Sequence, residues 1–350
     1  MFAQDIQNNK VKGNGYNFID LFAGAGGLSE GFFQAGFNPI AHVEMNPYAA
    51  QTLETRSCYY YLKKVNNLDL YYDYLRGNIS RKDFIRQIPK EVLKTVICET
   101  MSKQSLPGIF EKIDTILRED SISQVDVIVG GPPCQAYSIA GRAQDPNGMK
   151  NDYRNYLFES FVKIVDFFKP KLFVFENVPG MLKLYGGKVK EKIFEDFENL
   201  GYTMNVDVLY APEYGIPQIR KRAFFVGLLN SDVKFNYPKP ILDENNFISC
   251  KEAIDDLPSL EGDEDYNVNT VRDYSKEPTS EYEKKMRCNS KRVYNHTPTN
   301  HAQKTIDHIK MVPDGGKYTD LPPELSKKFK YHESLHRYNS NKPSLTIDTG

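Results

Sequence analysis

The stretch YNFIDLFAGAGGLSEGFFQAGFNPIAHVEMN, residues 16–46, decides the fold class of this chain. Its first eight residues are apolar enough for a buried strand, and GAGG at 24–27 forms a glycine turn. The next ten residues carry apolar side chains at helical spacing, and a second apolar strand ends at Glu44. A strand, a helix and a second strand in this order predict a parallel sheet with right-handed crossovers.

The same alternation continues downstream. Buried strands are predicted at 125–131 and 171–178, a helix at 155–168, and a hairpin within 203–229. Residues 52–123 are rich in tyrosine and charge, and we interpret them as a helical insertion that packs against the large domain. The fold class is therefore α/β, with a doubly wound and mostly parallel sheet.

The composition changes near residue 230. The chain has 350 residues and a net charge of −1, so it is not basic overall. Residues 241–280 hold eleven acidic and three basic side chains, whereas 281–342 hold thirteen basic and seven acidic ones. We therefore expect a large domain at 1–230 and a smaller, loop-rich domain that follows it.

The five cysteines do not form a CxxC pattern, and their number is odd. This argues against a disulfide framework and against a zinc site, so no metal is expected. The chain also lacks an apolar signal segment and any membrane-spanning stretch, so no membrane partner is expected. These features predict a cytoplasmic protein.

Two loops carry candidate chemistry at predicted strand ends. The glycine turn allows close approach of a ligand, and Glu44 is placed to bind ribose hydroxyls, although many nucleotide-binding folds share this pattern. In GGPPCQAYS at 130–138, two prolines stiffen the loop that presents Cys134. The alternative is a buried structural cysteine.

Two further motifs carry charge. Glu176 closes the buried strand of FVFENV, where an acid needs either a function or a partner such as an arginine. In YGIPQIRKRAFFVG at 214–227, Gln218, Arg220 and Arg222 alternate, so we expect them on one face of a strand. Such a face suits binding of an anion or a base edge, or an exposed ion-pair ladder.

The order and spacing of DLFAGAGG, GGPPCQAYS, ENV and QIRKR resemble the cytosine-C5 DNA methyltransferases of bacterial restriction-modification systems. NDYRNYLF at 151–158 and RYNSNKPSLTID at 337–348 resemble further motifs of the family. The resemblance implies a Rossmann-like domain that binds S-adenosyl-L-methionine and releases S-adenosyl-L-homocysteine. It implies a target-recognition domain at 231–336 and a return toward the catalytic domain at 337–350.

The resemblance also implies the site residues. The catalytic set is Cys134, Glu176, Arg220, Arg222, Pro133, Gln135 and Gln218. The cofactor-binding set is Asp20, Phe22, Ala23, Gly24, Gly26, Gly27, Leu28, Glu44, Met45, Pro132, Asn155 and Leu157.

In the implied reaction, Cys134 adds to carbon-6 of a cytosine that has been flipped out of double-stranded DNA, and carbon-5 then takes the methyl group. Glu176 binds the ring nitrogen and amine edge of the base. Arg222, with Arg220 behind it, steadies the base carbonyl or the glutamate.

Two features depart from the family pattern. The acidic contact to adenine is obscured, with Asn78, Asp114 and Asp120 as candidates. The final GN-containing motif is absent before Gly350, which leaves a truncated chain or complementation by another chain open.

Other functions remain as alternatives. A tRNA cytosine-5 methyltransferase would use the same chemistry, but the CFT tripeptide typical of that group is missing from 179–217. An inactive fragment that binds DNA or cofactor is a further alternative. The restriction-modification style of the motifs leaves open a cognate restriction endonuclease, without implying physical contact.

Overall fold

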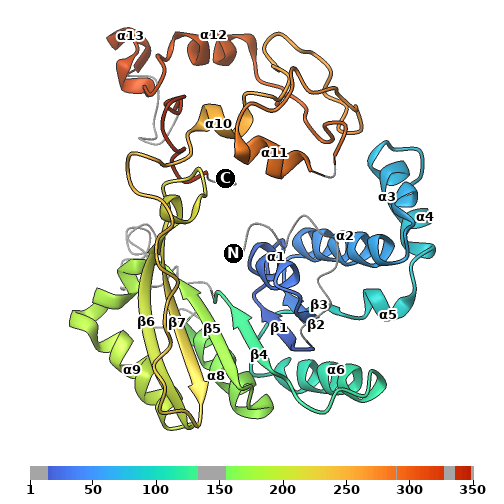
Figure 1. Ribbon diagram of the computed structural model, residues 1–350, viewed down its shortest axis with the longest axis vertical. Helices are drawn as coiled ribbons and strands as arrows, with labels where there is room; N and C mark the ends of the chain where they lie inside the picture. The colour runs from blue at the N-terminus through green and yellow to red at the C-terminus, as the bar shows by residue number, and fades with distance from the viewer. Residues whose placement is uncertain (1–14, 133–154, 289, 327–335, 348–350) are drawn as a thin grey trace. The chain divides into compact units, whose positions relative to one another are not determined.

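The computed structural model describes residues 15–132, 155–288, 290–326 and 336–347 (Figure 1). The predicted nucleophile Cys134 and its neighbours Pro133 and Gln135 lie outside the described residues.

One sheet organises the first part of the chain, up to residue 229. Its seven strands have the order β3-β2-β1-β4-β5-β7-β6. The strands are β1 (Asn17–Leu21), β2 (Asn38–Glu44), β3 (Val96–Cys98), β4 (Val127–Gly130), β5 (Leu172–Asn177), β6 (Tyr202–Tyr210) and β7 (Lys221–Leu229). The first five strands of this order run parallel, and β7 pairs antiparallel with β5. This confirms the predicted α/β class with a mostly parallel sheet. β6 and β7 are consecutive and adjacent, as the predicted hairpin requires.

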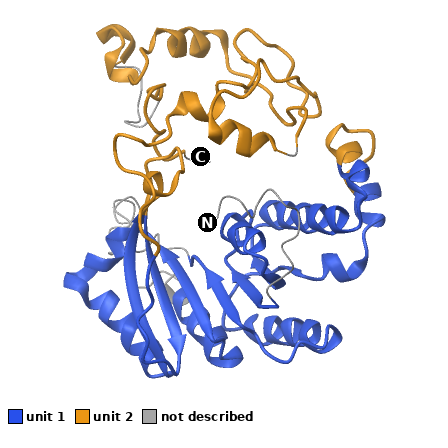
Figure 2. Cartoon of the chain, viewed as in Figure 1, with its two compact units in different colours: residues 1–71, 82–209, 222–237 blue, residues 72–81, 210–221, 238–350 orange. Residues whose placement is uncertain are grey.

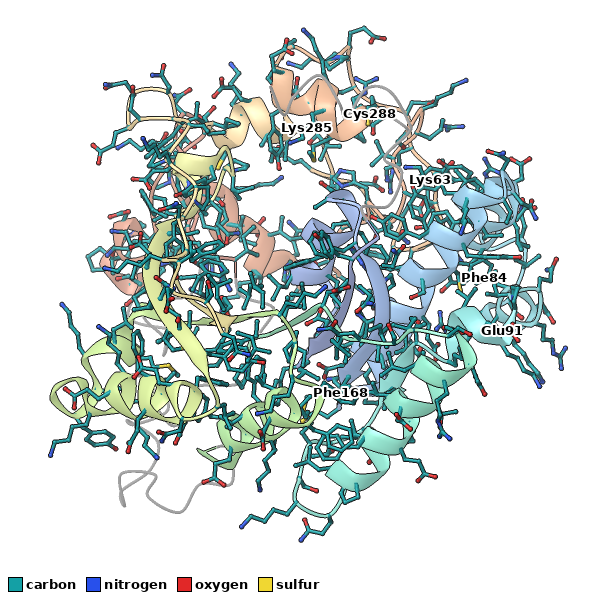
Figure 3. All side chains as sticks on the ribbon, turned by 60° about the horizontal axis from the view of Figure 1, so that its bottom comes forward. Lys63, Phe84, Glu91, Phe168, Lys285 and Cys288 are labelled. Atoms are coloured by element: carbon teal, nitrogen blue, oxygen red, sulfur yellow. The ribbon has the colours of Figure 1, made fainter. Side chains whose placement is uncertain are left out.

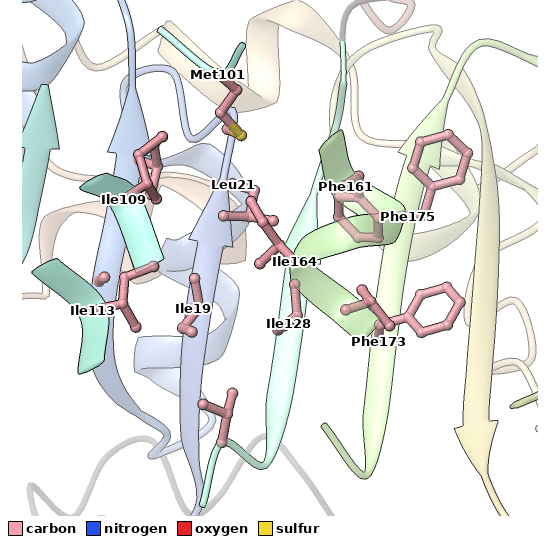
Figure 4. Packing of buried hydrophobic residues seen from close by; sticks show 14 of the residues in the cluster. Ile19, Leu21, Met101, Ile109, Ile113, Ile128, Phe161, Ile164, Phe173 and Phe175 are labelled. Carbon is pink, nitrogen blue, oxygen red and sulfur yellow. The ribbon is translucent and has the colours of Figure 1, made fainter. Parts of the chain in front are cut away.

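Successive strand residues point to opposite faces of the sheet, and both faces are covered. On one face, Phe18, Val127 and Val129 form a cluster with Leu28 and the phenylalanines of α1 (Gly27–Gln34). The larger cluster on the other face joins the sheet to α6 (Leu106–Glu119), α8 (Asn155–Phe168) and α9 (Lys188–Glu198). Figure 4 shows side chains of α6 and α8 packed over this second face. Helices on both faces make the sheet doubly wound, as predicted.

The segment predicted as a helical insertion is mostly helical, with one difference. It contains α2 (Pro47–Lys64), α3 (Leu68–Leu75), α4 (Arg81–Arg86), α5 (Lys90–Leu93) and α6. The sequence analysis missed β3, which extends the sheet by pairing in parallel with β2. Phe84 of α4 is fully buried, so this short helix is anchored by an aromatic side chain (Figure 3).

The chain divides into two compact units (Figure 2). Unit 1 comprises residues 1–71, 82–209 and 222–237, and unit 2 comprises 72–81, 210–221 and 238–350. Most of the segment 52–123 lies in unit 1, but residues 72–81 belong to unit 2. The functional assignment of 231–336 to target recognition remains a prediction.

The remaining elements are short. They are η2 (Pro179–Gly187), η3 (Ala211–Tyr214), α10 (Cys250–Ile254), α11 (Glu281–Arg287), α12 (Gln303–Met311), η4 (Tyr318–Asp320) and α13 (Pro323–Ser326). Within the described part of the chain, every helix is too short or too polar to cross a membrane.

Candidate active site

Several of the described site residues of unit 1 lie where parallel strands end. β1 leads into the glycine turn, β2 ends at Glu44, β4 leads into Gly131 and Pro132, and β5 ends at Asn177. The carboxyl ends of parallel strands share one edge of the sheet, which is where open α/β sheets bind their ligands.

The glycine turn has a backbone that few residues adopt. Phe22, Gly24 and Gly26 have φ of 57°, 54° and 85°. A left-handed conformation is strained for an aromatic residue, whereas glycine accepts it. A Cβ on Gly24 would meet no atom within 4 Å, so this glycine borders open space. A Cβ on Gly26 would lie 2.9 Å from Cδ2 of Leu53, so α2 closes the turn from that side.

Glu44 holds the glycine turn in place. Its Oε2 accepts a hydrogen bond of 2.8 Å from the backbone N–H of Gly24, and its Oε1 accepts one of 2.7 Å from that of Asn46. Asn46 in turn caps α2 by accepting from two backbone N–H groups. A carboxylate has about four acceptor sites, so Glu44 can still accept from hydroxyl groups of a ligand. The predicted role therefore gains a second component, the organisation of the loop.

A buried network of polar side chains from β1, α1 and β2 lies next to the glycine turn. Ser29 of α1 donates a hydrogen bond to Oδ2 of Asp20 in β1, and its Oγ lies 3.1 Å from Nδ1 of His42 in β2. Burial raises the pKa of Asp20 to about 7, the Ser29 hydrogen bond opposes this, and the Glu44 charge adds to it. Burial, together with the positive charge of Arg56, lowers the pKa of His42 to about 4.

Asp20 and His42 therefore interact through the hydroxyl of Ser29, which contacts both, and not as an ion pair. Their N–O distance is 4.0 Å, and the two pKa shifts favour the neutral form of each residue. The sequence analysis assigned no role to Ser29 or His42. The presence of one histidine within an apolar strand was the available signal.

A second network fastens α1 to α2 near the turn. Arg56 pairs with Glu30, whose other oxygen accepts a 2.6 Å hydrogen bond from the hydroxyl of Tyr60. The Tyr60 ring stacks on Phe33 with ring centroids 4.4 Å apart. The Nε atom of Arg56 would lie 3.1 Å from a Cβ on Gly26, so the guanidinium packs directly beside the turn.

The three candidates for the adenine contact have partners of their own. Asp120 pairs with Lys94, which precedes β3 and so marks the opposite edge of the sheet. Asp114 pairs with Arg118 on the exposed side of α6, and Asn78 donates to Asp73 within unit 2. Glu99 is an acid that directly follows β3, and its backbone N–H donates a 3.0 Å hydrogen bond to the carbonyl of Glu44. Its position depends on β3, which the sequence analysis missed.

Other predicted cofactor residues have mixed surroundings. Met45 is 52% exposed at the end of β2, where it is accessible to a ligand. Leu28 and Leu157 pack into the two hydrophobic clusters, so both have structural roles. Asn155 begins α8.

Glu176 and Arg222 form the centre of the predicted catalytic set. The Nε atom of Arg222 lies 2.7 Å from Oε1 of Glu176, and both side chains are about one-quarter exposed. Oε2 of Glu176 would lie 3.1 Å from a Cβ on Gly131, so the other carboxylate oxygen lies toward the loop that contains Cys134. The amide of Asn177, which is buried, donates to the carbonyl of Pro132 at 3.3 Å. Asn177 thus ties β5 to the same loop, a role that the sequence analysis did not predict.

The predicted common face of Gln218, Arg220 and Arg222 is wrong. β7 begins at Lys221, so only Arg222 lies on the strand. Gln218 instead forms an isolated parallel bridge with Ser344, and the neighbouring Ile219 N–H donates to the Ser344 carbonyl at 2.7 Å. Pairing with a distant segment, not continuation of β7, therefore sets the backbone there, and Gln218 and Arg220 belong to unit 2.

No group of three or more His, Cys, Asp or Glu side chains that could hold a metal occurs among the described residues. The arrangement instead offers a glycine turn, a carboxylate that organises it, and a glutamate–arginine pair beside Gly131.

Comparison with known proteins identifies relatives of this chain. The sequence profile of the C-5 cytosine-specific DNA methylases matches residues 16–86 and 82–344. The Type II methyltransferase M.Bpa9945I of Bacillus paralicheniformis is 38% identical over 272 residues, which cover 69% of this chain and 60% of that protein. The Type II methyltransferase M.DdeI of Desulfomicrobium norvegicum is 36% identical over 319 residues, which cover 89% of this chain and 64% of that protein.

A solved structure shares the fold. It is a protein described as a prophage-encoded DNA modification methyltransferase from E. coli, with a TM-score of 0.60 at 20% identity. The match covers 95% of this chain and 82% of that one, and identifies the Rossmann-like methyltransferase fold. The chain spans about 60–64% of the length of the two sequence relatives. The breadth of the profile match and the identity to M.Bpa9945I show that the chain belongs to the C-5 cytosine-specific DNA methylase family.

Proposed function

We propose that this chain is a DNA (cytosine-5-)-methyltransferase that transfers a methyl group from S-adenosyl-L-methionine to a cytosine in a specific duplex sequence. The observation that carries the proposal is the 2.7 Å Glu176–Arg222 pair beside Gly131, at the entrance to the loop that contains Cys134. This pair and the glycine turn lie at one edge of the same sheet. The family membership supports the same reaction.

The residues around the glycine turn fit S-adenosyl-L-methionine, which supplies an electrophilic methyl group when it is bound. Gly24 borders open space, and Glu44 retains acceptor capacity beyond its two backbone hydrogen bonds. We propose that Glu44 accepts hydrogen bonds from the ribose hydroxyls. Met45 and Glu99 would lie against the adenine end, because they follow β2 and β3 at this edge.

The catalytic steps follow from the residue types. The thiolate of Cys134 forms a bond to carbon-6 of cytosine, and the ring electron pair moves toward carbon-5. Glu176 in its acid form donates a hydrogen bond or a proton to the ring nitrogen, which disperses the added negative charge, and it takes the proton back as the sulfur leaves. Carbon-5 takes the methyl group, a base removes the carbon-5 proton, and the sulfur–carbon bond breaks to restore the thiolate. Arg222 keeps Oε1 of Glu176 occupied, so Oε2 is the oxygen available to the base.

The substrate we propose is double-stranded DNA, from which the target base is extruded, since carbon-6 cannot be reached inside the helix. Residues 231–336 would read the target sequence. Both relatives are named Type II methyltransferases, which supports a cognate restriction endonuclease as the biological counterpart of this chain.

Trapping on modified DNA tests the proposal. A duplex that contains 5-fluorocytosine should hold the wild-type chain as a covalent adduct, because fluorine cannot leave as the proton does. Cys134→Ser should abolish the adduct and turnover while S-adenosyl-L-methionine still binds. The matched control is Cys98→Ser, since Cys98 is exposed at the end of β3.

Three outcomes would contradict the proposal. An adduct that persists in Cys134→Ser and disappears in Cys98→Ser would assign the nucleophile elsewhere. Transfer of tritiated methyl groups to tRNA but not to plasmid DNA would favour the RNA enzyme. Binding of cofactor without transfer to either acceptor would indicate an inactive fragment.

A further inference from the structure

Unit 2 contains a segment that is remote in the sequence from the rest of it. Residues 72–81 join this unit, although its other parts begin at residue 210 (Figure 2). Two contacts made by this segment involve side chains of the region 263–296. The chain therefore brings ten residues of the predicted insertion into the unit to which we assign target recognition.

The first contact is aromatic. The rings of Tyr72 and Tyr294 have centroids 5.5 Å apart with an interplanar angle of 31°. The guanidinium of Arg76 lies 5.7 Å from the centroid of the Tyr72 ring, and its Nη2 lies 3.5 Å from the Tyr294 hydroxyl. Burial raises the pKa of Tyr72, as expected for a phenol covered by this packing.

The second contact is a close approach at a turn. Gly77 has φ of +73°, and a Cβ there would lie 2.7 Å from Nδ2 and 2.9 Å from Cγ of Asn269. Asn78 closes the turn by donating to Oδ1 of Asp73 at 3.0 Å. The left-handed backbone at 77 therefore favours glycine, and a Cβ there would push the Asn269 side chain aside.

Asn269 and Tyr294 lie close in sequence to Arg272 and Val293, which join the two ends of the region 263–296. Arg272 and Val293 form an antiparallel bridge through two 2.9 Å backbone hydrogen bonds. Arg272 also pairs with Asp263 at 2.6 Å and donates to the His296 carbonyl at 2.7 Å. The segment 72–78 thus contacts a residue near each end of the Arg272–Val293 bridge, Asn269 and Tyr294.

This region has little apolar core of its own. From residue 238 onward, the buried hydrophobic side chains among the described residues are Val293, Val312, Tyr318 and Leu321. Because few apolar contacts are buried here, the conformation of the loops depends on polar contacts and on contacts between aromatic rings. Side chains that read base edges have to be held to within fractions of an ångström.

We infer that Tyr72 and Gly77 are positioning residues for DNA target discrimination, which act by holding the loop region 263–296. The inference rests on the proposed DNA methyltransferase function. The proposed target-recognition unit is then discontinuous in sequence. Residues 72–78 contact the loops that read the DNA and do not contact the reacting atoms.

Gly77→Ala tests the inference, with Gly262→Ala as the matched control. Both glycines have φ of +73°, but a Cβ on Gly262 would meet nothing within 4 Å. The two variants therefore share the backbone strain, and only Gly77→Ala pushes on Asn269. Asn269→Ala removes the two atoms nearest to the new Cβ, leaves only the Asn269 Cβ at 3.2 Å, and should rescue Gly77→Ala.

The readout is discrimination between a target duplex and the same duplex with one base pair changed, measured as methylation rates. The target is taken from sites that the wild-type chain methylates on plasmid DNA. Gly77→Ala should lower the discrimination ratio by about tenfold, because each base mismatch normally changes binding by one to two orders of magnitude. Gly262→Ala and the rescued double variant should keep the wild-type ratio, and the Kd for S-adenosyl-L-homocysteine should be unchanged in all three.

Equal discrimination in Gly77→Ala and Gly262→Ala, or failure of Asn269→Ala to rescue, would overturn the inference while the proposed function stands. A wild-type chain that methylates no DNA would overturn both. Should Gly77→Ala not fold, Tyr294→Ala is compared with Tyr266→Ala, whose side chain is 41% exposed. Loss of discrimination in Tyr294→Ala alone supports the inference, and equal discrimination in both overturns it.

Discussion

Glu44→Gln separates the two roles of the carboxylate at the end of β2. Glutamine keeps one acceptor oxygen and replaces the other by an amide donor. Either Gly24 N–H or Asn46 N–H, now 2.8 and 2.7 Å from carboxylate oxygens, must then face a donor. A hydrogen bond to a charged group contributes about 1.5–3 kcal/mol, so cofactor affinity should fall about ten- to a hundredfold.

Calorimetric titration with S-adenosyl-L-homocysteine, without DNA, measures this change. The control is Glu119→Gln, because Glu119 is 58% exposed and pairs with Lys94 ahead of β3, away from the site. The second step repeats the titration with a ligand that lacks a ribose hydroxyl. If Glu44 binds the ribose, the effects of the mutation and of the missing hydroxyl should not add.

Two results would contradict the proposed roles of Glu44, and they can be told apart. An unchanged Kd in Glu44→Gln would refute both roles. A weakened Kd with additive effects would leave Glu44 as an organiser of the glycine turn alone, and the ribose contact would be wrong.

Three further predictions concern separate parts of unit 1. Arg222→Leu should lower the methylation rate by about 10²–10³-fold with cofactor affinity unchanged, and Arg222→Lys should lower it less; equal rates in both variants would argue against a role for the guanidinium. Gly130→Ala places a Cβ 2.5 Å from the Leu21 carbonyl oxygen and should lower the free energy of unfolding by about 1–3 kcal/mol in urea titrations, whereas Gly108→Ala, in open space on α6, should raise it by up to about 1 kcal/mol. In wild type, the contribution of Asp20 to the free energy of unfolding falls as the pH rises toward 7, whereas that of His42 falls as the pH drops from 6.5 toward 4. The two residues therefore change the stability with pH in opposite directions. His42→Gln removes the pH dependence that His42 contributes and leaves that of Asp20. The unfolding free energy of this variant, relative to wild type, should therefore rise by up to about 1.4 kcal/mol per pH unit on acidification from pH 6.5 to 4. A difference that does not change with pH would show that His42 is not held neutral.

Several features of the fold could be predicted from local sequence. Continuous apolar runs mark β1, β4 and β5, because a strand with helices on both sides buries successive residues in opposite layers. Glycine and proline at their ends mark the loops that carry the site. The position of Glu176 at the end of β5 followed from the same pattern.

Three features were decided only by tertiary structure. β3 has three residues, too few for a periodic signal, and it is a strand because β2 offers it hydrogen-bond partners. Gln218 leaves the expected strand because Ser344, far along the chain, pairs with it. Residues 72–81 belong to unit 2 through contacts such as those with Asn269 and Tyr294. Periodicity and turn residues are local properties that a short stretch of sequence displays, whereas a pairing partner two hundred residues away is selected only when the chain folds.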